Sequence, residues 1–306
     1  MKLQNLGSKK LAIAVAVFIL VTTAFVLAYF KLGSRVNLRG PSKAKIATTI
    51  FPLYDIVKNV ASNEIDVVVI LKPGASPHTF DPTPKDAEAL SKSKILFAIG
   101  HNLDNWAFKM ATSVGVDKIV TVDKYISLIQ SQEADEPGVN PHYWLSVKNA
   151  TLIAKQVKEE LSTAFPDKEA VFEENYQNYS KRLNTLDSEV QNELAGLPNR
   201  DIATFHAAWD YFAKDYNLNV VATFEEFPGK EPTPEYLADF QKKIKESNIK
   251  VIFAEPQFST AALVPVAKDL GVEIIVIDPE GGGIPGVKTY EEMTRYNVNR
   301  IQQALK

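Results

Sequence analysis

Three of the four histidines in the sequence, His78, His142 and His206, stand in segments that suit a bound metal ion. Each follows an apolar run of the strand type, either directly or after one loop. Imidazole nitrogen is a good ligand for zinc and similar cations. A single histidine in such a place is more often a hydrogen-bonded or surface residue. Three of them in loops that we expect to face one crevice indicate a metal site.

A carboxylate follows another apolar run in the same way. Asp278 ends the run at 273–277 and opens the sequence Asp-Pro-Glu-Gly-Gly-Gly, in which the glycines allow close approach of the backbone. The sequence contains no cysteine, so thiolate ligands are excluded. Three histidines and one carboxylate satisfy tetrahedral zinc without cysteine, and Asp278 is therefore the candidate fourth ligand.

Three further polar residues lie near the ends of strand-like runs. Glu255, in Phe-Ala-Glu-Pro-Gln, could accept a hydrogen bond from a ligand histidine. The alternative is a carboxylate that caps a helix or forms an ion pair. His101, in Gly-His-Asn-Leu-Asp, is interpreted as a surface residue at the rim of the crevice. Asp123 is expected to cap a helix.

An internal repeat explains why these residues follow strands. Residues 45–48, 94–98 and 119–123 resemble residues 201–204, 250–254 and 274–278, at offsets of 155 or 156. Between the first two matches, each half contains a Pro-Gly followed by a Pro-Thr-Pro. The first half has a longer stretch between these two motifs, and only that stretch contains a histidine, His78. The scaffold is therefore repeated, whereas the candidate ligand is not.

Each half is predicted to fold as four strands that alternate with helices. Such alternation is typical of a parallel sheet covered on both faces. Sheets of this kind bind ligands at the carboxyl ends of their strands, so two halves side by side create a crevice there. The predicted strands are the short β-branched runs at 45–50, 65–71, 94–99, 118–122, 200–205, 219–224, 250–254 and 273–277.

One long helix is predicted to join the halves. The segment 165–196 begins with Phe-Pro-Asp, which suits a helix start, and is followed by Leu-Pro after Gly196, which suits a stop. About thirty helical residues measure about 45 Å, which is longer than an ordinary crossover. Because the interior lacks Gly/Ser composition, we expect a rigid strut. The predicted fold is therefore α/β, with two (β/α)4 lobes, four-stranded parallel sheets, one connecting helix and a metal site in the cleft between the lobes.

The N-terminus is expected to place the rest of the chain outside the cytoplasm. The largely apolar run 11–30 carries no charge, and twenty such residues span a hydrocarbon core of about 30 Å. A cleaved signal peptide is the alternative, although its apolar region is usually shorter. We expect a protein in the periplasm or on the outer face of the cytoplasmic membrane, tethered by residues 11–30. The expected organisation is an anchor or signal segment at 1–32, a linker at 33–43, an N-terminal lobe at 44–164, a connecting helix at 165–197 and a C-terminal lobe at 198–306.

Charge and composition exclude several classes of function. The 34 basic and 37 acidic residues give a net charge of −3, and residues 40–306 hold 28 bases against 37 acids. A nucleic-acid partner requires a basic face, so we expect none. The absence of cysteine excludes disulfides, a cysteine nucleophile and a lipid-modified cysteine. No phosphate-binding loop, dinucleotide fingerprint or serine nucleophile elbow is present.

The motifs together resemble the zinc- and manganese-binding solute-binding proteins of metal ABC transporters, the ZnuA/TroA-like family (cluster A-I). The resemblance covers essentially all of residues 44–306. It implies two (β/α)4 lobes bridged by one long helix, a metal buried between them, and a monomer that delivers the ion to an ABC permease in the membrane. The family's ligands fall on His78, His142, His206 and Asp278. The motifs are Pro-His-Thr-Phe-Asp-Pro-Thr-Pro, Asn-Pro-His-Tyr-Trp-Leu, Phe-His after a strand, Phe-Ala-Glu-Pro-Gln-Phe and Ile-Asp-Pro-Glu-Gly-Gly.

The third ligand position favours zinc (Zn²⁺) over manganese (Mn²⁺). In this family that position is histidine in zinc binders and often glutamate in manganese binders, and here it is His206. Nitrogen-rich coordination also suits zinc better than manganese. The sequence departs from many zinc binders at 130–140, which is short, acidic and free of histidine. It also lacks the lipidated cysteine of many members from single-membrane bacteria.

Two other functions compete with metal capture. Three histidines with a water in the fourth position form a catalytic pattern, so a zinc hydrolase with Glu255 as general base is one alternative. Against it, Asp278 would close the coordination shell and no substrate-orienting motif is evident. A surface adhesion protein is the other alternative, and the sequence contains no feature for or against it. We therefore expect a binding protein and not an enzyme.

Overall fold

The computed structural model describes residues 15, 17, 18, 20–23, 44–131 and 138–306. The described residues between 15 and 23 are helical and form a unit separate from residues 43–306. Most of the predicted anchor at 11–30, and the linker at 33–43, lie outside the described residues. Among the helices that the structure describes, none is long and apolar enough to cross a membrane.

The first lobe contains a four-stranded parallel sheet in the order β2-β1-β3-β4. Both neighbours of β1 run parallel to it, with Ile46 opposite Val67 on one side and Ile95 on the other. Apolar residues of the central strands are buried on both faces because helices cover the sheet. The elements are β1 (Lys45–Thr48), α2 (Phe51–Ala61), β2 (Asp66–Val69), α3 (Pro84–Leu90), β3 (Ser93–Ala98), α4 (Asn105–Val114) and β4 (Lys118–Thr121).

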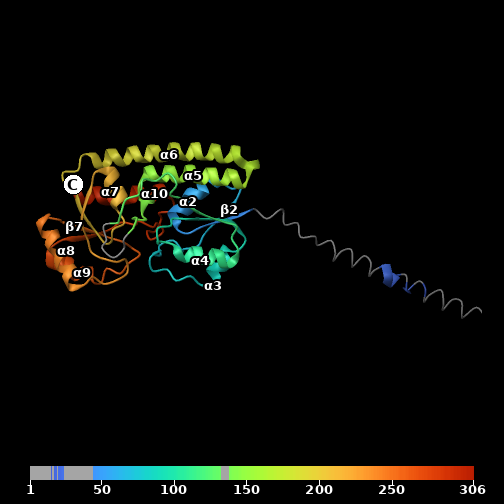
Figure 1. Ribbon diagram of the computed structural model, residues 1–306, viewed down its shortest axis with the longest axis horizontal. Helices are drawn as coiled ribbons and strands as arrows, with labels where there is room; N and C mark the ends of the chain where they lie inside the picture. Colours follow the sequence, from blue (N-terminus) through green and yellow to red (C-terminus); the bar gives the residue numbers. More distant parts are fainter. Residues whose placement is uncertain (1–14, 16, 19, 24–43, 132–137) are drawn as a thin grey trace, which may run out of the picture. The chain divides into compact units, whose positions relative to one another are not determined.

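The second lobe repeats this arrangement in the order β6-β5-β7-β8. Among the described residues the two lobes thus contain two equivalent parallel sheets, which confirms the predicted fold class (Figure 1). Each strand lies within a predicted apolar run, except that β3 begins one residue earlier, at Ser93. The elements are β5 (Asp201–Thr204), α7 (Asp210–Tyr216), β6 (Asn219–Thr223), α8 (Pro234–Glu246), β7 (Val251–Ala254), α9 (Leu263–Leu270), β8 (Glu273–Val276) and the C-terminal α10 (Tyr290–Leu305).

The repeated Pro-Thr-Pro motif marks the start of one helix in each lobe. Helices α3 and α8 both begin with a proline, and a threonine stands at the N-cap position before it. The backbone nitrogen and the hydroxyl of Thr83 both donate to Asp86, whereas the hydroxyl of Thr233 accepts from the backbone nitrogen of Tyr236. A capping threonine followed by proline is a strong helix start, because proline has no N–H to leave unsatisfied.

The predicted connecting helix is present as α6 (Glu169–Ala195), preceded by a short 3₁₀ turn at Pro166–Lys168. Helix α5 (Val147–Ala164) runs beside it, and α6 also contacts α2, α7 and α10, so it touches elements of both lobes (Figure 1). Six apolar side chains at helical spacing form its buried face: Phe172, Tyr179, Leu183, Leu186, Val190 and Leu194. An amphipathic helix of this kind is held by packing and not by intrinsic propensity alone.

Candidate metal centre

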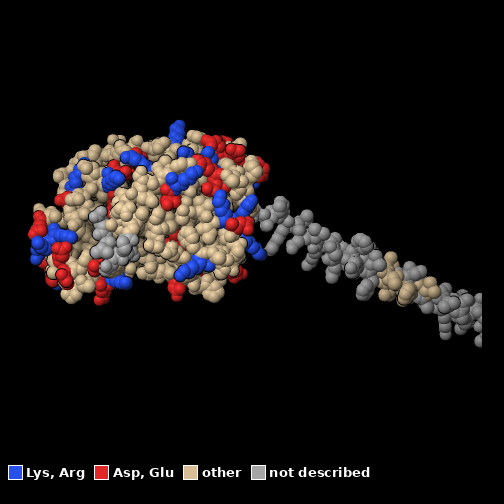
Figure 2. Space-filling model, in the orientation of Figure 1, with Lys and Arg blue, Asp and Glu red and all other residues tan. Residues whose placement is uncertain are grey.

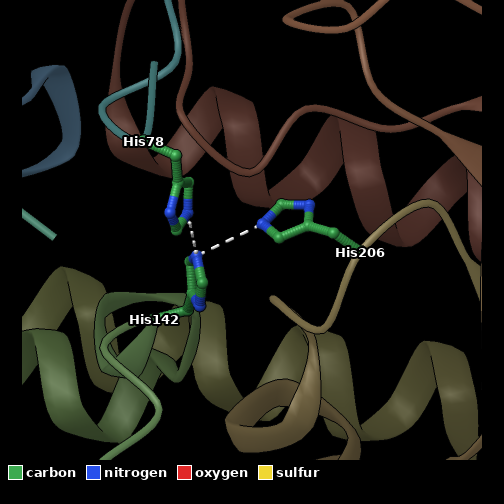
Figure 3. Close-up of side chains that lie close together, drawn as sticks. All are labelled: His78, His142 and His206. Atoms are coloured by element: carbon green, nitrogen blue, oxygen red, sulfur yellow. Dashed lines mark hydrogen bonds between the residues drawn. The ribbon is translucent and has the colours of Figure 1, made fainter. Parts of the chain in front are cut away.

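The structure brings His78, His142 and His206 together, as Figure 3 shows. The Nε2 atom of His142 lies 3.1 Å from that of His78 and 3.2 Å from that of His206. Nitrogens that share one zinc ion at 2.0–2.1 Å in a tetrahedron lie about 3.4 Å apart. Two of the three nitrogen pairs thus have nearly the spacing that a common ion requires, and all three ligand atoms lie within 4.8 Å of one another.

Each histidine reaches the centre from a different loop. His78 lies in the proline-rich loop after β2, and its backbone nitrogen donates to the Ser76 hydroxyl. His142 precedes the 3₁₀ turn Tyr143–Leu145, which leads into α5. His206 follows β5, two residues beyond its last residue, Thr204. The carboxyl ends of strands from both sheets thus supply the site, as expected for parallel α/β sheets.

Two of the three rings are oriented by acceptors at their other nitrogen. Nδ1 of His206 lies 2.9 Å from Oε1 of Glu255, which is buried. Nδ1 of His142 lies 2.9 Å from Oδ1 of Asn140. Acceptors at Nδ1 place the hydrogen there and leave the Nε2 lone pair for a metal. Glu255 therefore lies where an outer-shell acceptor belongs, and its contact with Nδ1 of His206 removes it from the Nε2 side.

Burial and mutual repulsion keep the rings of His78 and His142 neutral. Burial, followed by the nearby His206, lowers the pKa of His78 to about 3. Burial also lowers the pKa of His142 well below its ordinary value, and the other two rings add to the effect. At neutral pH both rings are therefore uncharged, which is the form that metal binding needs.

Asp278 is completely buried beside the site but lies outside the group of three histidines. Its Oδ1 accepts from the Gln257 side chain and from the backbone of Glu280 and Gly281. Its Oδ2 accepts from the backbone of Gly283. The carboxylate thus organises the turn 278–283, and the structure does not show it as a metal ligand.

Sequence analysis missed Glu280 in the same turn. This side chain is 5% exposed, and among the described residues its Oε2 has no hydrogen-bond partner. Burial and the carboxylates of Asp278 and Glu255 raise its pKa well above the ordinary value. A signal was available in the sequence, since Glu280 stands directly before the three glycines that were singled out.

Carboxyl side chains outnumber basic ones in the buried interior of both lobes, within the described residues. The second lobe buries four carboxylates, and the first buries Asp55 and Asp104. Within the described part of the chain, no lysine or arginine belongs to the buried class. Buried charge is costly unless it is paired or binds a metal, so the surroundings fit a cation. The four carboxylates of the second lobe are Glu225, Glu255, Asp278 and Glu280.

The fourth histidine stands apart from this group. Nε2 of His101 lies 2.9 Å from Oδ2 of Asp123, and both side chains are partly exposed. This agrees with a position at the rim for His101. Asp123 contacts His101 instead of capping a helix, because the next helical element described after β4 is the distant 3₁₀ turn Tyr143–Leu145.

A cavity of about 320 Å³ leads from solvent to the histidines, and His78 is the one of the three that lines it. Its walls come from both lobes. The first lobe contributes Pro77, Phe80, Asn102, Leu103, Asn105 and Trp106, and the second contributes Phe227, Pro228 and Lys230.

The fold and the site together define a two-lobed α/β protein with a three-histidine centre in the inter-lobe cleft. Residues 46–304 match the family described as "Zinc-uptake complex component A periplasmic" (ZnuA). The chain belongs to this family.

Relatives and solved structures agree with that assignment. The zinc-binding protein AdcA of Streptococcus pyogenes is 27% identical over 262 residues, which cover 78% of this chain and 51% of AdcA. This chain thus spans about half the length of those relatives. The metal ABC transporter substrate-binding lipoprotein SsaB of Streptococcus sanguinis is also 27% identical, with 86% and 90% covered. A crystal structure of ZnuA superposes with a TM-score of 0.78 at 26% identity and covers 87% of this chain and all of that one. FpvC of Pseudomonas aeruginosa, in complex with Mn²⁺, gives a TM-score of 0.78 at 25% identity, with 86% and 99% covered.

Proposed function

We propose that this chain captures a divalent transition metal, with zinc as the physiological ion, and delivers it to an ABC permease. The observation that carries the proposal is the convergence of three Nε2 atoms at 3.1 and 3.2 Å, two of them with their Nδ1 atoms held by acceptors. The buried Glu255 carboxyl behind His206 fits a site that holds a cation. The names of the relatives, which include zinc-binding proteins and a metal transporter lipoprotein, point the same way.

Zinc is preferred over manganese because the ligand set is rich in nitrogen. All three atoms that converge are imidazole nitrogens. Manganese prefers sites that are richer in oxygen ligands. Manganese remains the alternative cargo, since FpvC resembles this chain in fold and was solved with Mn²⁺.

The turn 278–283 supplies the fourth ligand in this proposal. Asp278 is the ligand that the sequence predicts, although both its oxygens already accept hydrogen bonds within the turn. Glu280 is the competing candidate, since one of its oxygens has no partner among the described residues. The pair D278N and E280Q separates them, because the variant that loses more zinc affinity identifies the ligand.

A role in binding fits better than catalysis. Glu255, the base of the alternative hydrolase, contacts Nδ1 of His206 and so lies behind the ring, away from the Nε2 atoms. An ABC permease as partner, a monomeric state and a location outside the cytoplasm with residues 11–30 as tether belong to the same proposal. The face drawn in Figure 2 mixes acidic and basic side chains without a continuous basic patch. The excess of acids in residues 40–306 is the reason that we propose no nucleic-acid partner.

The decisive experiment measures the metal content of protein purified without chelator, followed by competition between zinc and manganese. We expect one zinc per chain, displaced by manganese only at large excess. The variant H142A should weaken zinc affinity by orders of magnitude and leave the circular dichroism spectrum unchanged. Unchanged zinc affinity of H142A in calorimetry would refute the site.

A further inference from the structure

The side chain of Asn140 uses all of its hydrogen-bonding capacity between two of the candidate ligands. Its Oδ1 accepts from the backbone nitrogen of His142 at 3.0 Å and lies 2.9 Å from Nδ1 of the same residue. Its Nδ2 donates to the backbone oxygen of Ala207 at 2.8 Å and to the Asp210 carboxylate at 3.0 Å. Asn140 is 2% exposed, so water does not compete for these contacts.

These contacts determine which nitrogen of His142 carries the hydrogen. Two acceptors surround one end of the amide, and this end must therefore be the NH₂ group. The other end is then the carbonyl oxygen, which can only accept. Nδ1 of His142 must donate to it, and the neutral ring keeps its lone pair on Nε2, where the three rings meet.

The same amide attaches the His142 segment to the second lobe. Ala207 directly follows His206, and Asp210 opens α7. The hydroxyl of Tyr211, also in α7, donates to the backbone oxygen of Asn140 at 3.0 Å.

Further contacts continue this attachment towards α5. The indole of Trp144 donates to the backbone oxygen of Pro279 at 2.8 Å. The hydroxyl of Tyr290 donates to the backbone oxygen of Trp144 at 2.7 Å, and the Ser146 hydroxyl donates to Asp215. The segment 140–146 belongs to the first half in sequence but is bonded largely to elements of the second.

His78 is held in a different way. Among the residues that the structure describes, Nδ1 of His78 has no hydrogen-bond acceptor, and the ring lines the cavity that opens to solvent. Among the described residues, its loop is joined to the second lobe by one backbone hydrogen bond, from Gly74 to Gly281 at 3.0 Å, and by packing of Pro73 and Thr79 against Gly282 and Gly229. The site therefore divides into two ligands fixed to one body and one ligand on a separate loop.

We propose that Asn140 is a positioning residue that fixes the tautomer of His142 and ties this ligand to the second lobe, so that His78 is the ligand that departs when the site opens. This inference rests on the proposed function. It places the line of opening between His78 and the other two histidines, instead of between the two halves of the sequence.

The first test removes the amide and keeps its shape. In N140L, long-range ¹H–¹⁵N NMR of the zinc-free protein should show that His142 no longer populates only the Nδ1–H tautomer. Zinc affinity should fall by about 10- to 100-fold, the range for loss of an outer-shell partner. N175L is the matched control, because Asn175 donates one hydrogen bond from α6 to Val60 far from the site. It should leave the tautomer and the affinity unchanged. An unaltered tautomer and affinity in N140L would overturn the positioning role.

The second test separates the tautomer from the attachment. N140D keeps the acceptor for His142 but sets a second carboxylate against Asp210, so amide hydrogen exchange of 140–146 should rise about tenfold while the tautomer is retained. Adding D210N supplies a donor to that carboxylate and should restore the protection. Failure of the double variant to restore it would show that the Asn140–Asp210 contact is not what ties the segment to the second lobe.

The third test identifies the ligand that moves. Hydrogen exchange of the wild-type protein, with and without zinc, should show protection gained at 74–80 and nearly equal protection at 140–146. An equal or larger gain at 140–146 would overturn the proposal. If the wild-type protein binds no zinc, the proposed function fails by itself, whereas the tautomer and the exchange of 140–146 are measured on zinc-free protein and judge the role of Asn140 separately.

Discussion

An aspartate follows the fourth strand of each sheet, but its surroundings differ between the two lobes. After β4, Asp123 is partly exposed and pairs with His101 at the rim of the cleft. After β8, Asp278 is completely buried and accepts four hydrogen bonds, three of them from the backbone of its own turn. The sheets are alike in strand order and direction, so the difference arises in the turn. The repeated scaffold places an aspartate at the same position after the strand in both lobes. The turn that follows determines whether its side chain lies in solvent or in the interior.

The loops after β2 and β6 likewise differ between the lobes, although the strands before them are equivalent. Both begin near a Pro-Gly and end at the Pro-Thr-Pro that starts a helix. The longer loop of the first lobe carries His78 to the centre, whereas the shorter one of the second lobe contributes Phe227 and Pro228 to the cavity wall. The candidate ligand His78 thus lies on a longer loop, while the strand order is the same in both sheets.

The largest expected effect is on zinc affinity, which should distinguish a histidine of the converging group from the histidine at the rim. A structural zinc site contributes about 10–16 kcal/mol, so one ligand of four is worth roughly 3 kcal/mol, or a factor of about 100 in affinity. H206A should therefore lower zinc affinity by at least about 100-fold. H101A, at the rim of the first lobe, should change it by less than about twofold. Equal losses of zinc affinity in the two variants, measured by calorimetry, would contradict the distinction between the site histidine and the rim histidine.

A methyl group in the glycine turn should disturb the contact between the lobes. A Cβ added at Gly282 would lie 2.2 Å from Cβ of Pro73, and the backbone there has a φ of +79°. At Gly271, which ends α9 with a φ of +67°, nothing lies within 4 Å of an added Cβ. We expect G271A to cost about 1 kcal/mol of unfolding free energy and G282A about 3 kcal/mol. Urea denaturation measures both, and similar costs would show that the close approach has little energetic weight.

A buried carboxylate of the first lobe should make the stability depend on pH. Burial raises the pKa of Asp55 from 3.8 to about 6, against the opposing hydrogen bond from Tyr290. The folded protein thus holds this proton more tightly than the unfolded chain. The stabilisation is present below about pH 4 and is lost as the pH rises through 6, by on the order of 2 kcal/mol. D55N should remove this component in denaturation curves between pH 4 and 7, and an unchanged pH dependence would contradict the assignment.

The last comparison concerns the unfolding free energy of variants of Asp278 and Asp123, and the smallest effect is expected for D123N. D278N places an NH₂ group among donors, so it should lower the unfolding free energy by about 2 kcal/mol. D123N weakens a partly exposed ion pair, which is worth at most about 1 kcal/mol. Thermal or urea denaturation of the two variants compares them directly. A larger loss for D123N would reverse the contrast between the two strand ends.

Most of the architecture was predictable because it depends on local patterns that repeat. The β-branched runs predict all eight strands, and the offset of 155 or 156 residues predicts two equivalent sheets. The connecting helix followed from its length, its polar composition and its proline and glycine ends. These features are determined by residues close together in the chain, so sequence alone carries them.

The site was predictable only in part. The positions of three histidines after strands indicated their convergence, and the structure brings them together. The roles of the neighbours depend on contacts across about seventy residues or more, such as Asn140 with Asp210 or Trp144 with Pro279. Such contacts have no local pattern. For the same reason, the assignment of His142 to a lobe could not be read from its place in the sequence.

Helix α6 continues for 27 residues without a break and touches helices of both lobes. A rod fixed along two bodies resists bending, so the elastic cost of prising them apart rises with the angle. Wide opening of the two lobes about a hinge is therefore unfavourable, and the site should stay closed most of the time. We therefore expect spontaneous release of a bound ion to be slow, and we expect a partner protein to speed it by displacing the loop that carries His78.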